Sequence, residues 1–112
     1  MSPSSADPDT IAVLRRLAAA VQFSYVSPQA LSDMMAHKLK LEDVADAIVE
    51  WIDIPGRVKP TTIHSIPGRK GDPAYELKPS VNGTTWYIKV CIDDRNGPEE
   101  GLALLSAHSD HC

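Results

Sequence analysis

The hydrophobic pattern of this chain changes period once, at Pro55-Gly56, and that change limits the folds it can adopt. Before this point apolar residues recur every three to four positions, as in amphipathic helices. After it they alternate with polar residues, as in β-strands. The chain has 112 residues, which is the size of one domain. Helices followed by strands predict an α+β fold in which three N-terminal helices pack on one face of a small antiparallel sheet of three to four strands.

The first two helices are predicted from the residues at which they begin. Asp7-Pro8 and Ser27-Pro28 each combine a capping side chain with a proline at the first helical position. These signals predict helices over residues 8–21 and 28–37. The residues before the first helix have the composition of a tail, so we expect residues 1–8 to be disordered and residues 9–112 to form a single domain.

The third helix is the clearest prediction, beginning near residue 41 and ending at Pro55-Gly56. Its apolar residues share one face, and acidic residues occupy the other, which is most simply a solvated surface. The apolar residues are Leu41, Val44, Ala45, Ile48, Trp51 and Ile52.

The second half of the chain predicts the strands. KPTTIHSI alternates well enough for a strand over residues 60–66, and FSYV, in the first half, predicts a short extended piece. Asn82-Gly83 is typical of a type I′ turn, so AYELK and TTWYIKVCI are expected to form a hairpin around it. The nearly continuous apolar run LALLSAH suits a central or well-covered strand.

The strand after the Asn-Gly turn presents two different faces. Its even-numbered residues from Trp86 to Ile92 are apolar and face the core, whereas Tyr87 and Lys89 face the other way. That second face is either an ordinary solvated sheet surface or a rigid support for reactive groups. The strand pattern by itself leaves both interpretations open.

The charge of the chain is unevenly distributed. The net charge is −4, which argues mildly against a nucleic-acid partner. However, residues 57–89 contain six basic and two acidic residues, while the segments on either side each have a net charge of −4. A polyanion would dock most readily on this basic segment, although charge blocks of this size also arise by chance.

Several classes of protein are disfavoured by the sequence. No apolar run approaches the ~18 residues of a membrane helix. The N-terminal segment is acidic, unlike a signal peptide, so we expect a cytoplasmic protein with no membrane partner. Cys91 and Cys112 give no disulfide framework, and Cys91 is expected to be buried and inert. The tail HSDHC holds potential zinc ligands, but we expect no functional metal site there, because functional sites usually draw ligands from ordered elements. No motif predicts a cofactor.

The polar residues of the second half suit the cleavage of a phosphodiester without a metal. Cleavage of RNA by its own 2′-hydroxyl needs a base, cations beside the phosphorus, and an acid for the leaving oxygen. A histidine, with an ordinary pKa of about 6.5, can transfer protons at neutral pH, which makes His108 the best candidate. Tyrosine, with a reference pKa of about 10, is a poor base unless lysines depress that pKa, so Tyr87 is expected to orient the phosphate. The candidate set is Lys59, His64, Arg69, Lys70, Lys78, Tyr87, Lys89 and His108.

From VKPTTIHS through AYELKPSVNGTTWYIKV to LALLSAH, the chain resembles the MqsR-type (motility quorum-sensing regulator) toxins of the RelE-like group of bacterial mRNA-cleaving toxins. Lys59 matches a lysine that follows their last helix. Pro79 stands eight residues before Tyr87 of the Tyr-x-Lys strand, as a proline does in the family. LSAH echoes a final Val-Ser-Phe-basic pattern. The resemblance covers about residues 28–109.

This resemblance implies the toxin of a type II toxin-antitoxin system, an mRNA interferase that cuts single-stranded mRNA without metal and leaves a 2′,3′-cyclic phosphate. It also implies growth arrest and silencing by a cognate antitoxin protein, itself a candidate DNA-binding protein. The family's catalytic lysine and tyrosine match Lys59 and Tyr87, and His108 replaces a C-terminal basic residue. The expected substrate-binding residues are Lys89, Arg69, Lys70, His64 and Lys78.

The chain also departs from the family pattern. The family's glutamine before the second strand falls near Ala74, Ala107 replaces an aromatic residue, and the overall charge is acidic. His64 either joins the site or is an ordinary sheet residue sharing a face with Thr62 and Ile66. The alternative hypothesis is therefore a catalytically inactive domain of the same fold that binds a protein partner or has a regulatory role.

Overall fold

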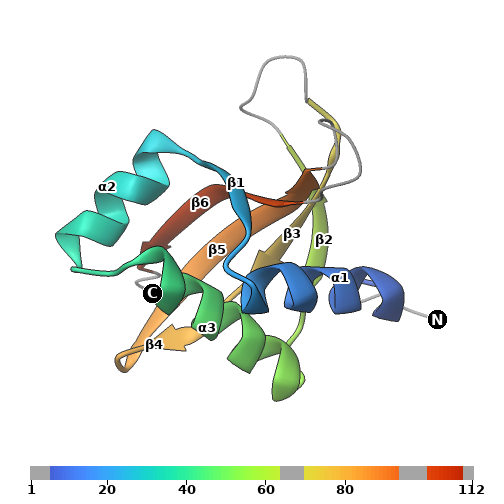
Figure 1. Cartoon of the computed structure of the whole chain (residues 1–112), viewed down its shortest axis with the longest axis horizontal. Helices are drawn as coiled ribbons and strands as arrows, with labels where there is room; N and C mark the ends of the chain where they lie inside the picture. The colour runs from blue at the N-terminus through green and yellow to red at the C-terminus, as the bar shows by residue number, and fades with distance from the viewer. Residues whose placement is uncertain (1–5, 64–69, 94–100, 110–112) are drawn as a thin grey trace.

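The computed structural model describes residues 6–63, 70–93 and 101–109, and within them the chain has the α+β architecture that the sequence predicts. Three helices and six strands are present in this part of the chain (Figure 1). None of the described helices is long and apolar enough to span a membrane. In chain order the elements are α1 (Pro8–Ala19), β1 (Phe23–Val26), α2 (Pro28–Ala36), α3 (Leu41–Asp53), β2 (Lys59–Thr62), β3 (Pro73–Leu77), β4 (Ser80–Val81), β5 (Thr84–Asp93) and β6 (Gly101–Ser109).

Both predicted cap residues begin helices. Asp7 accepts a hydrogen bond from the backbone N–H of Thr10, and Ser27 accepts one from the N–H of Ala30. The helix α1 ends before residue 21, the end predicted from the sequence, because Val21 has a φ of 51° and cannot continue a right-handed helix. Of the eight residues predicted as a tail, residues 1–5 lie outside the described residues, while Asp7 and Pro8 form the start of α1.

The sheet is larger than predicted and is mixed. Its strand order is β1-β6-β5-β3-β2, with β4 paired to β5. The prediction of three to four antiparallel strands did not count β4, a two-residue part of the hairpin next to its turn, or β1. The FSYV segment is extended, as expected, but it joins the sheet by pairing with β6 in parallel. A parallel neighbour needs a long crossover connection, and a run of four residues carries no signal that identifies its distant partner. The predicted continuation of β2 over residues 64–66 lies outside the described residues.

The hairpin is formed as predicted. Asn82 and Gly83 have φ angles of 53° and 80°, and a positive φ at both central residues is the requirement of a type I′ turn. The same register holds on both sides of the break between β3 and β4, pairing Val81 with Thr84 next to the turn and Leu77 with Ile88 further along. The turn therefore determines which residues of β3 lie opposite those of β5.

The main core lies between the helices and one face of the sheet, and Figure 1 shows α1 and α3 in front of the strands. On β5 this face carries Trp86, Ile88 and Val90, as the alternation predicts. The buried helix residues that pack against it are Leu14, Leu17, Ala18, Ala30, Met34, Val44 and Ile48.

The opposite face of the sheet has an apolar end and a polar end. A smaller buried cluster at the apolar end consists of Ile63, Ala74, Cys91, Ala103 and Leu105. The register between β5 and β6 shifts after Lys89, so one residue of β6 has no partner. Leu102, Leu104 and Ala107 of β6 belong to the main core, and Ala103 and Leu105 belong to the smaller cluster. Because both faces of β6 are buried along much of its length, its apolar run in the sequence is nearly continuous. The polar end of this face holds part of the predicted site, namely Lys59, Tyr87, Lys89 and His108.

Candidate functional site

Strand register places four polar side chains in one row across the sheet. Lys59 on β2 pairs with Glu76 on β3, Glu76 pairs with Lys89 on β5, and Lys89 pairs with Ser106 on β6. Adjacent strands lie about 4.8 Å apart, so neighbouring side chains within this row can interact. The row faces away from the helices, because Val58, next to Lys59, is buried in the main core.

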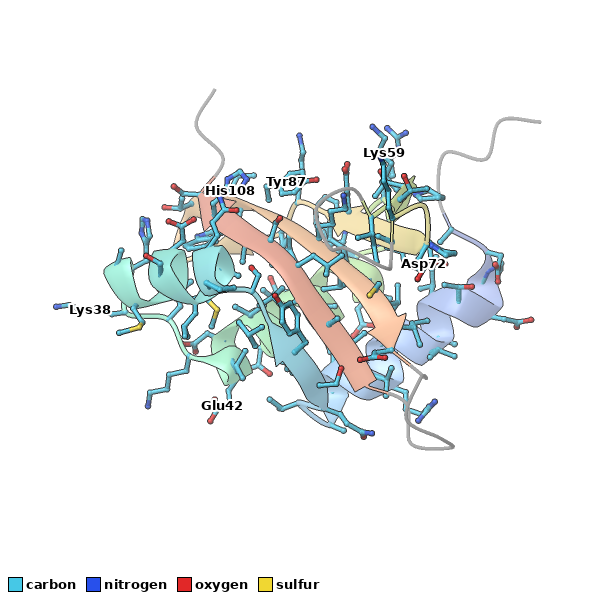
Figure 2. All side chains as sticks on the ribbon, turned by 90° about the horizontal axis from the view of Figure 1, so that it is seen from above. Lys38, Glu42, Lys59, Asp72, Tyr87 and His108 are labelled. Atoms are coloured by element: carbon cyan, nitrogen blue, oxygen red, sulfur yellow. The ribbon has the colours of Figure 1, made fainter. Side chains whose placement is uncertain are left out.

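Tyr87 and His108 form a second pair beside this row. They are directly opposite each other on β5 and β6, and their rings are stacked, with centroids 5.0 Å apart and planes at 7°. Figure 2 shows Lys59, Tyr87 and His108 on the side of the sheet that faces away from α1 and α3. The sheet thus brings together three residues that are far apart in the sequence.

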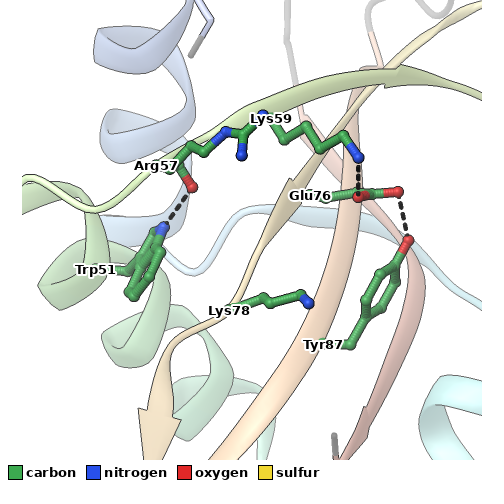
Figure 3. A pocket seen from close by; sticks show the side chains of 6 residues that line it. All are labelled: Trp51, Arg57, Lys59, Glu76, Lys78 and Tyr87. Carbon is green, nitrogen blue, oxygen red and sulfur yellow. Dashed lines mark hydrogen bonds and ion pairs between the residues drawn. The ribbon is translucent and has the colours of Figure 1, made fainter. Parts of the chain in front are cut away.

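Glu76 joins Tyr87 to Lys59. The hydroxyl of Tyr87 donates a hydrogen bond to Oε2 of Glu76 at 2.7 Å, and Nζ of Lys59 lies 4.0 Å from Oε1 of the same carboxylate (Figure 3). The Glu76 side chain is 19% exposed and that of Lys59 is 56% exposed. The Tyr87 contact is therefore the tighter of the two, and the lysine can move without breaking it.

The pKa of Tyr87 is raised well above its ordinary value of 10.0. The largest cause is burial of the phenol, followed by its hydrogen bond to Glu76 and the negative charge of that carboxylate. Near neutral pH the phenol therefore keeps its proton. It can donate a hydrogen bond and orient a ligand, but it cannot serve as a base.

His108 is partly exposed, and its ring lies flat against that of Tyr87. Nδ1 of His108 is 3.1 Å from the carbonyl oxygen of Ser109. In the tautomer that donates this hydrogen bond, Nε2 is the nitrogen left for exchange of a proton with a ligand.

A pocket of about 330 Å³ opens beside these residues. It combines three basic side chains with one carboxylate and two aromatic rings, so it offers positive charge beside flat apolar surface (Figure 3). His108 does not line this pocket but contacts Tyr87, which does. The lining residues are Trp51, Arg57, Lys59, Glu76, Lys78 and Tyr87.

The connection from α3 to β2 forms one wall of the pocket, and hydrogen bonds to Trp51 hold it in place. The indole N–H of Trp51 donates to the carbonyl of Arg57 at 2.8 Å, and the N–H of Gly56 donates to the carbonyl of Trp51 at 2.6 Å. A Cβ on Gly56 would lie 2.3 Å from two carbons of the Trp51 ring, so only glycine fits there. This packing determines the position of Arg57 in the connection and of Lys59 at the start of β2.

The structure places the predicted site residues unevenly. Lys59, Lys78 and Tyr87 line the pocket, while Lys89 lies in the polar row between Glu76 and Ser106. Lys70 is exposed in the turn before β3, at the end of the β2–β3 pair that lies away from Lys59, and it does not line the pocket. Two further predicted residues, His64 and Arg69, lie outside the described residues.

Three pocket residues were not predicted as site residues. Glu76 could have been found, because counting outward from the Asn82-Gly83 turn places it opposite Lys89. Arg57 belongs to the basic segment but stands in a connection whose direction the sequence does not specify. The helical pattern of α3 predicts Trp51 as a core residue, and no local signal indicates that its ring reaches a pocket.

No protein-family model, curated protein or solved structure matches this chain. The chemistry of the site is nevertheless well defined. Lysine and arginine can bind a phosphate, Glu76 can accept a proton, and His108 can donate one. Tyr87 touches both of these proton-transfer candidates. The arrangement suits the chemistry of an anionic ester.

Proposed function

We propose that this protein is a metal-independent endoribonuclease of the MqsR type within the RelE-like superfamily, acting as the toxin of a type II toxin-antitoxin pair. The observation that carries the proposal is the shared contact of Tyr87 with Glu76 and His108, beside a pocket that also holds Lys59 and Lys78. A base, an acid and cations are the three requirements for cleavage of RNA through its 2′-hydroxyl.

In the proposed reaction Glu76 accepts the proton of the 2′-hydroxyl, and the 2′-oxygen attacks the adjacent phosphorus. The bond from phosphorus to the 5′-oxygen breaks, and protonated His108 gives its proton to that oxygen. The products are a 2′,3′-cyclic phosphate and a free 5′-hydroxyl. Lys59 and Lys78 stabilise the charge that accumulates on the phosphorane oxygens, and the protonated phenol of Tyr87 holds Glu76 in place.

The proposed substrate is single-stranded mRNA in the cytoplasm. The chain carries a net charge of −4, so long-range attraction to RNA is weak and binding depends on the basic residues around the pocket. Such local contacts are sensitive to salt. The proposal includes a cognate antitoxin protein that binds the toxin and prevents growth arrest.

The test combines cleavage in vitro with growth in cells. Purified protein is incubated with a single-stranded RNA in the presence of a chelator, and the ends of the products are mapped. We expect 2′,3′-cyclic phosphate ends, and we expect His108→Ala and Glu76→Gln each to reduce cleavage by about 10² or more while the fold is retained. Induced expression should arrest growth, and co-expression of a small neighbouring gene should restore it.

The carboxylate of Glu76 also favours a second function. It occupies the pocket between Lys59 and Tyr87, and so repels a phosphate there. This contact supports the alternative of an inactive domain of the same fold that binds a protein partner. Growth arrest that persists in a Tyr87→Ala, His108→Ala double variant, with no new RNA ends, would favour this alternative over the nuclease.

A further inference from the structure

We infer that Trp51 and Arg57 form a nucleobase subsite, so that the pocket takes one unpaired nucleotide, with its base on Trp51 and its phosphate toward Lys59. The inference rests on the proposed function for the class of ligand. It adds a contact to the base, whereas the residues proposed for the chemistry contact only phosphate and sugar. It also explains why an aromatic residue of a helix lines a pocket otherwise formed mainly by the sheet.

The pocket has two chemically different sides, visible in Figure 3. Trp51 belongs to α3 and Arg57 to the connection after it, and both lie on one side of the pocket. Tyr87 and Glu76 lie on the other side, and Lys78 lies between the two sides. A ligand that stacks on the ring of Trp51 and is bound by the two lysine ammonium groups of the pocket needs a flat apolar part joined to an anionic part. A nucleotide has this form.

Trp51 is held in one orientation before any ligand arrives. Its indole N–H is bonded to the carbonyl of Arg57, and the backbone of Gly56 covers part of its ring. The ring remains partly exposed where it lines the pocket, whereas Trp86 is 2% exposed and belongs to the core. A preorganised aromatic surface loses little conformational entropy when a base stacks on it. Trp51 is thus prepared for a contact that Trp86 cannot make.

The size of the pocket favours a single unpaired nucleotide. At about 330 Å³ it lies near the lower end of the range of about 300–1,000 Å³ for small-molecule sites. Proteins bind single strands by stacking unpaired bases on aromatic rings and on arginine, beside cations that track the phosphates. Such stacking tolerates any base, so the subsite selects for a single strand more than for a particular sequence.

The test is a double-mutant cycle between Trp51 and one base of an oligonucleotide. Single-stranded RNAs carrying 2′-deoxyribose throughout the central segment cannot be cleaved there, and in each of them one central base is removed to leave an abasic position. Dissociation constants are measured for the wild type, Trp51→Ala and Trp51→Phe. We expect one abasic position to weaken binding to the wild type by about 10-fold. Trp51→Ala should weaken binding to the intact strand by a similar factor and leave binding to the abasic strand unchanged, and Trp51→Phe should retain most of the affinity.

Tyr25→Ala is the matched control, because Tyr25 is a 42% exposed aromatic on β1, at the opposite edge of the sheet from β2. It should bind both strands as the wild type does. Arg57→Gln gives a second test that keeps the backbone carbonyl bonded to Trp51. It should weaken binding to the intact strand more than to the abasic strand even if Trp51→Ala fails to fold.

The outcomes separate this inference from the proposed function. Independent, multiplicative effects of Trp51→Ala and base removal would overturn the subsite, and so would a wild type that binds no oligonucleotide. If the wild type binds and the two changes are coupled, the subsite is supported. Failure of that same protein to cleave the all-ribose strand would then reject the nuclease alone.

Discussion

The ring of Tyr87 lies parallel to the imidazole of His108, with the two centroids 5.0 Å apart, while its hydroxyl donates to Glu76 at 2.7 Å. One side chain therefore positions both groups that could move a proton. Because β5 and β6 hold the two rings directly opposite each other, the stacking follows from strand register and needs no loop. The first two predictions test the two residues of the Tyr87–Glu76 hydrogen bond.

Tyr87→Phe keeps the ring that stacks on His108 and removes only the hydroxyl. We expect cleavage to fall by about 10-fold to 10²-fold, because the carboxylate of Glu76 loses the donor that holds it.

The pH dependence of the free energy of unfolding should also change in Tyr87→Phe. The pKa of Tyr87 is higher in the folded protein than its ordinary value of 10.0, so the phenol stabilises the fold fully below that pH, and this stabilisation is lost as the pH rises toward the folded pKa.

Urea denaturation of the wild type and of Tyr87→Phe at about pH 8 and about pH 11 measures this difference. The free energy of unfolding should fall more steeply between the two pH values in the wild type than in the variant. Equal slopes in the two proteins would show that the hydroxyl of Tyr87 is no better protected from ionisation in the folded state than in the unfolded state.

Glu76→Gln separates binding from catalysis. The variant removes a negative charge from a basic pocket, so RNA should bind more tightly, by up to about 5-fold for a partly exposed charge. The amide cannot accept the proton of a 2′-hydroxyl, so the turnover rate should fall by about 10² or more. KM and kcat should therefore both decrease, and Glu76→Asp, which keeps the charge, should not tighten binding. A variant that binds and cleaves like the wild type would exclude Glu76 as the base.

Local chemistry in the sequence predicts those parts of the fold that depend on neighbouring residues. The caps at Asp7 and Ser27 and the turn at Asn82-Gly83 are each formed by side chains or φ angles within a few residues. The turn also determines the pairing of β3 with β5, so the position of Glu76 was within reach of sequence reasoning. A two-residue hairpin carries its register with it.

The remaining features depend on contacts between distant residues. The parallel partner of β1 is reached only after two helices and four strands, and four residues carry no information about it. The extra residue in β6 is Leu105, and its place depends on two cores that require apolar side chains on both faces of the strand. Trp51 is predicted as a core residue because it lies on the apolar face of α3. Its place in the pocket depends on the close packing of Gly56 against its ring.

Gly56→Ala should disturb the pocket through Trp51. The added methyl group would lie 2.3 Å from carbons of the indole and 2.7 Å from the Trp51 carbonyl oxygen, so the connection must move. We expect a loss of about 1–3 kcal/mol in the free energy of unfolding, the usual cost of overpacking. The bond from the indole N–H to the Arg57 carbonyl should weaken as well.

The control for this clash is the same substitution made in a Trp51→Ala background. There the indole is absent, so Gly56→Ala should cost clearly less than in the wild type, and the difference measures the coupling between the two residues. Denaturation of the four proteins provides all the values. Equal costs in both backgrounds would mean that the backbone, and not the indole, requires glycine.

Lys59→Met tests whether the pocket binds phosphate by charge. Each phosphate contact to a single strand contributes about 0.7 to the slope of the logarithm of affinity against the logarithm of salt concentration. Removing the Lys59 ammonium, on a side chain that is 56% exposed, should lower that slope by about this amount as well as weakening binding at low salt. Lys38→Met is the matched control, because Lys38 is exposed and lies after α2, far from Tyr87 and Lys59 in Figure 2. An equal change of slope in both variants would point to diffuse attraction by the whole surface, whereas an unchanged slope in Lys59→Met would place the phosphate elsewhere.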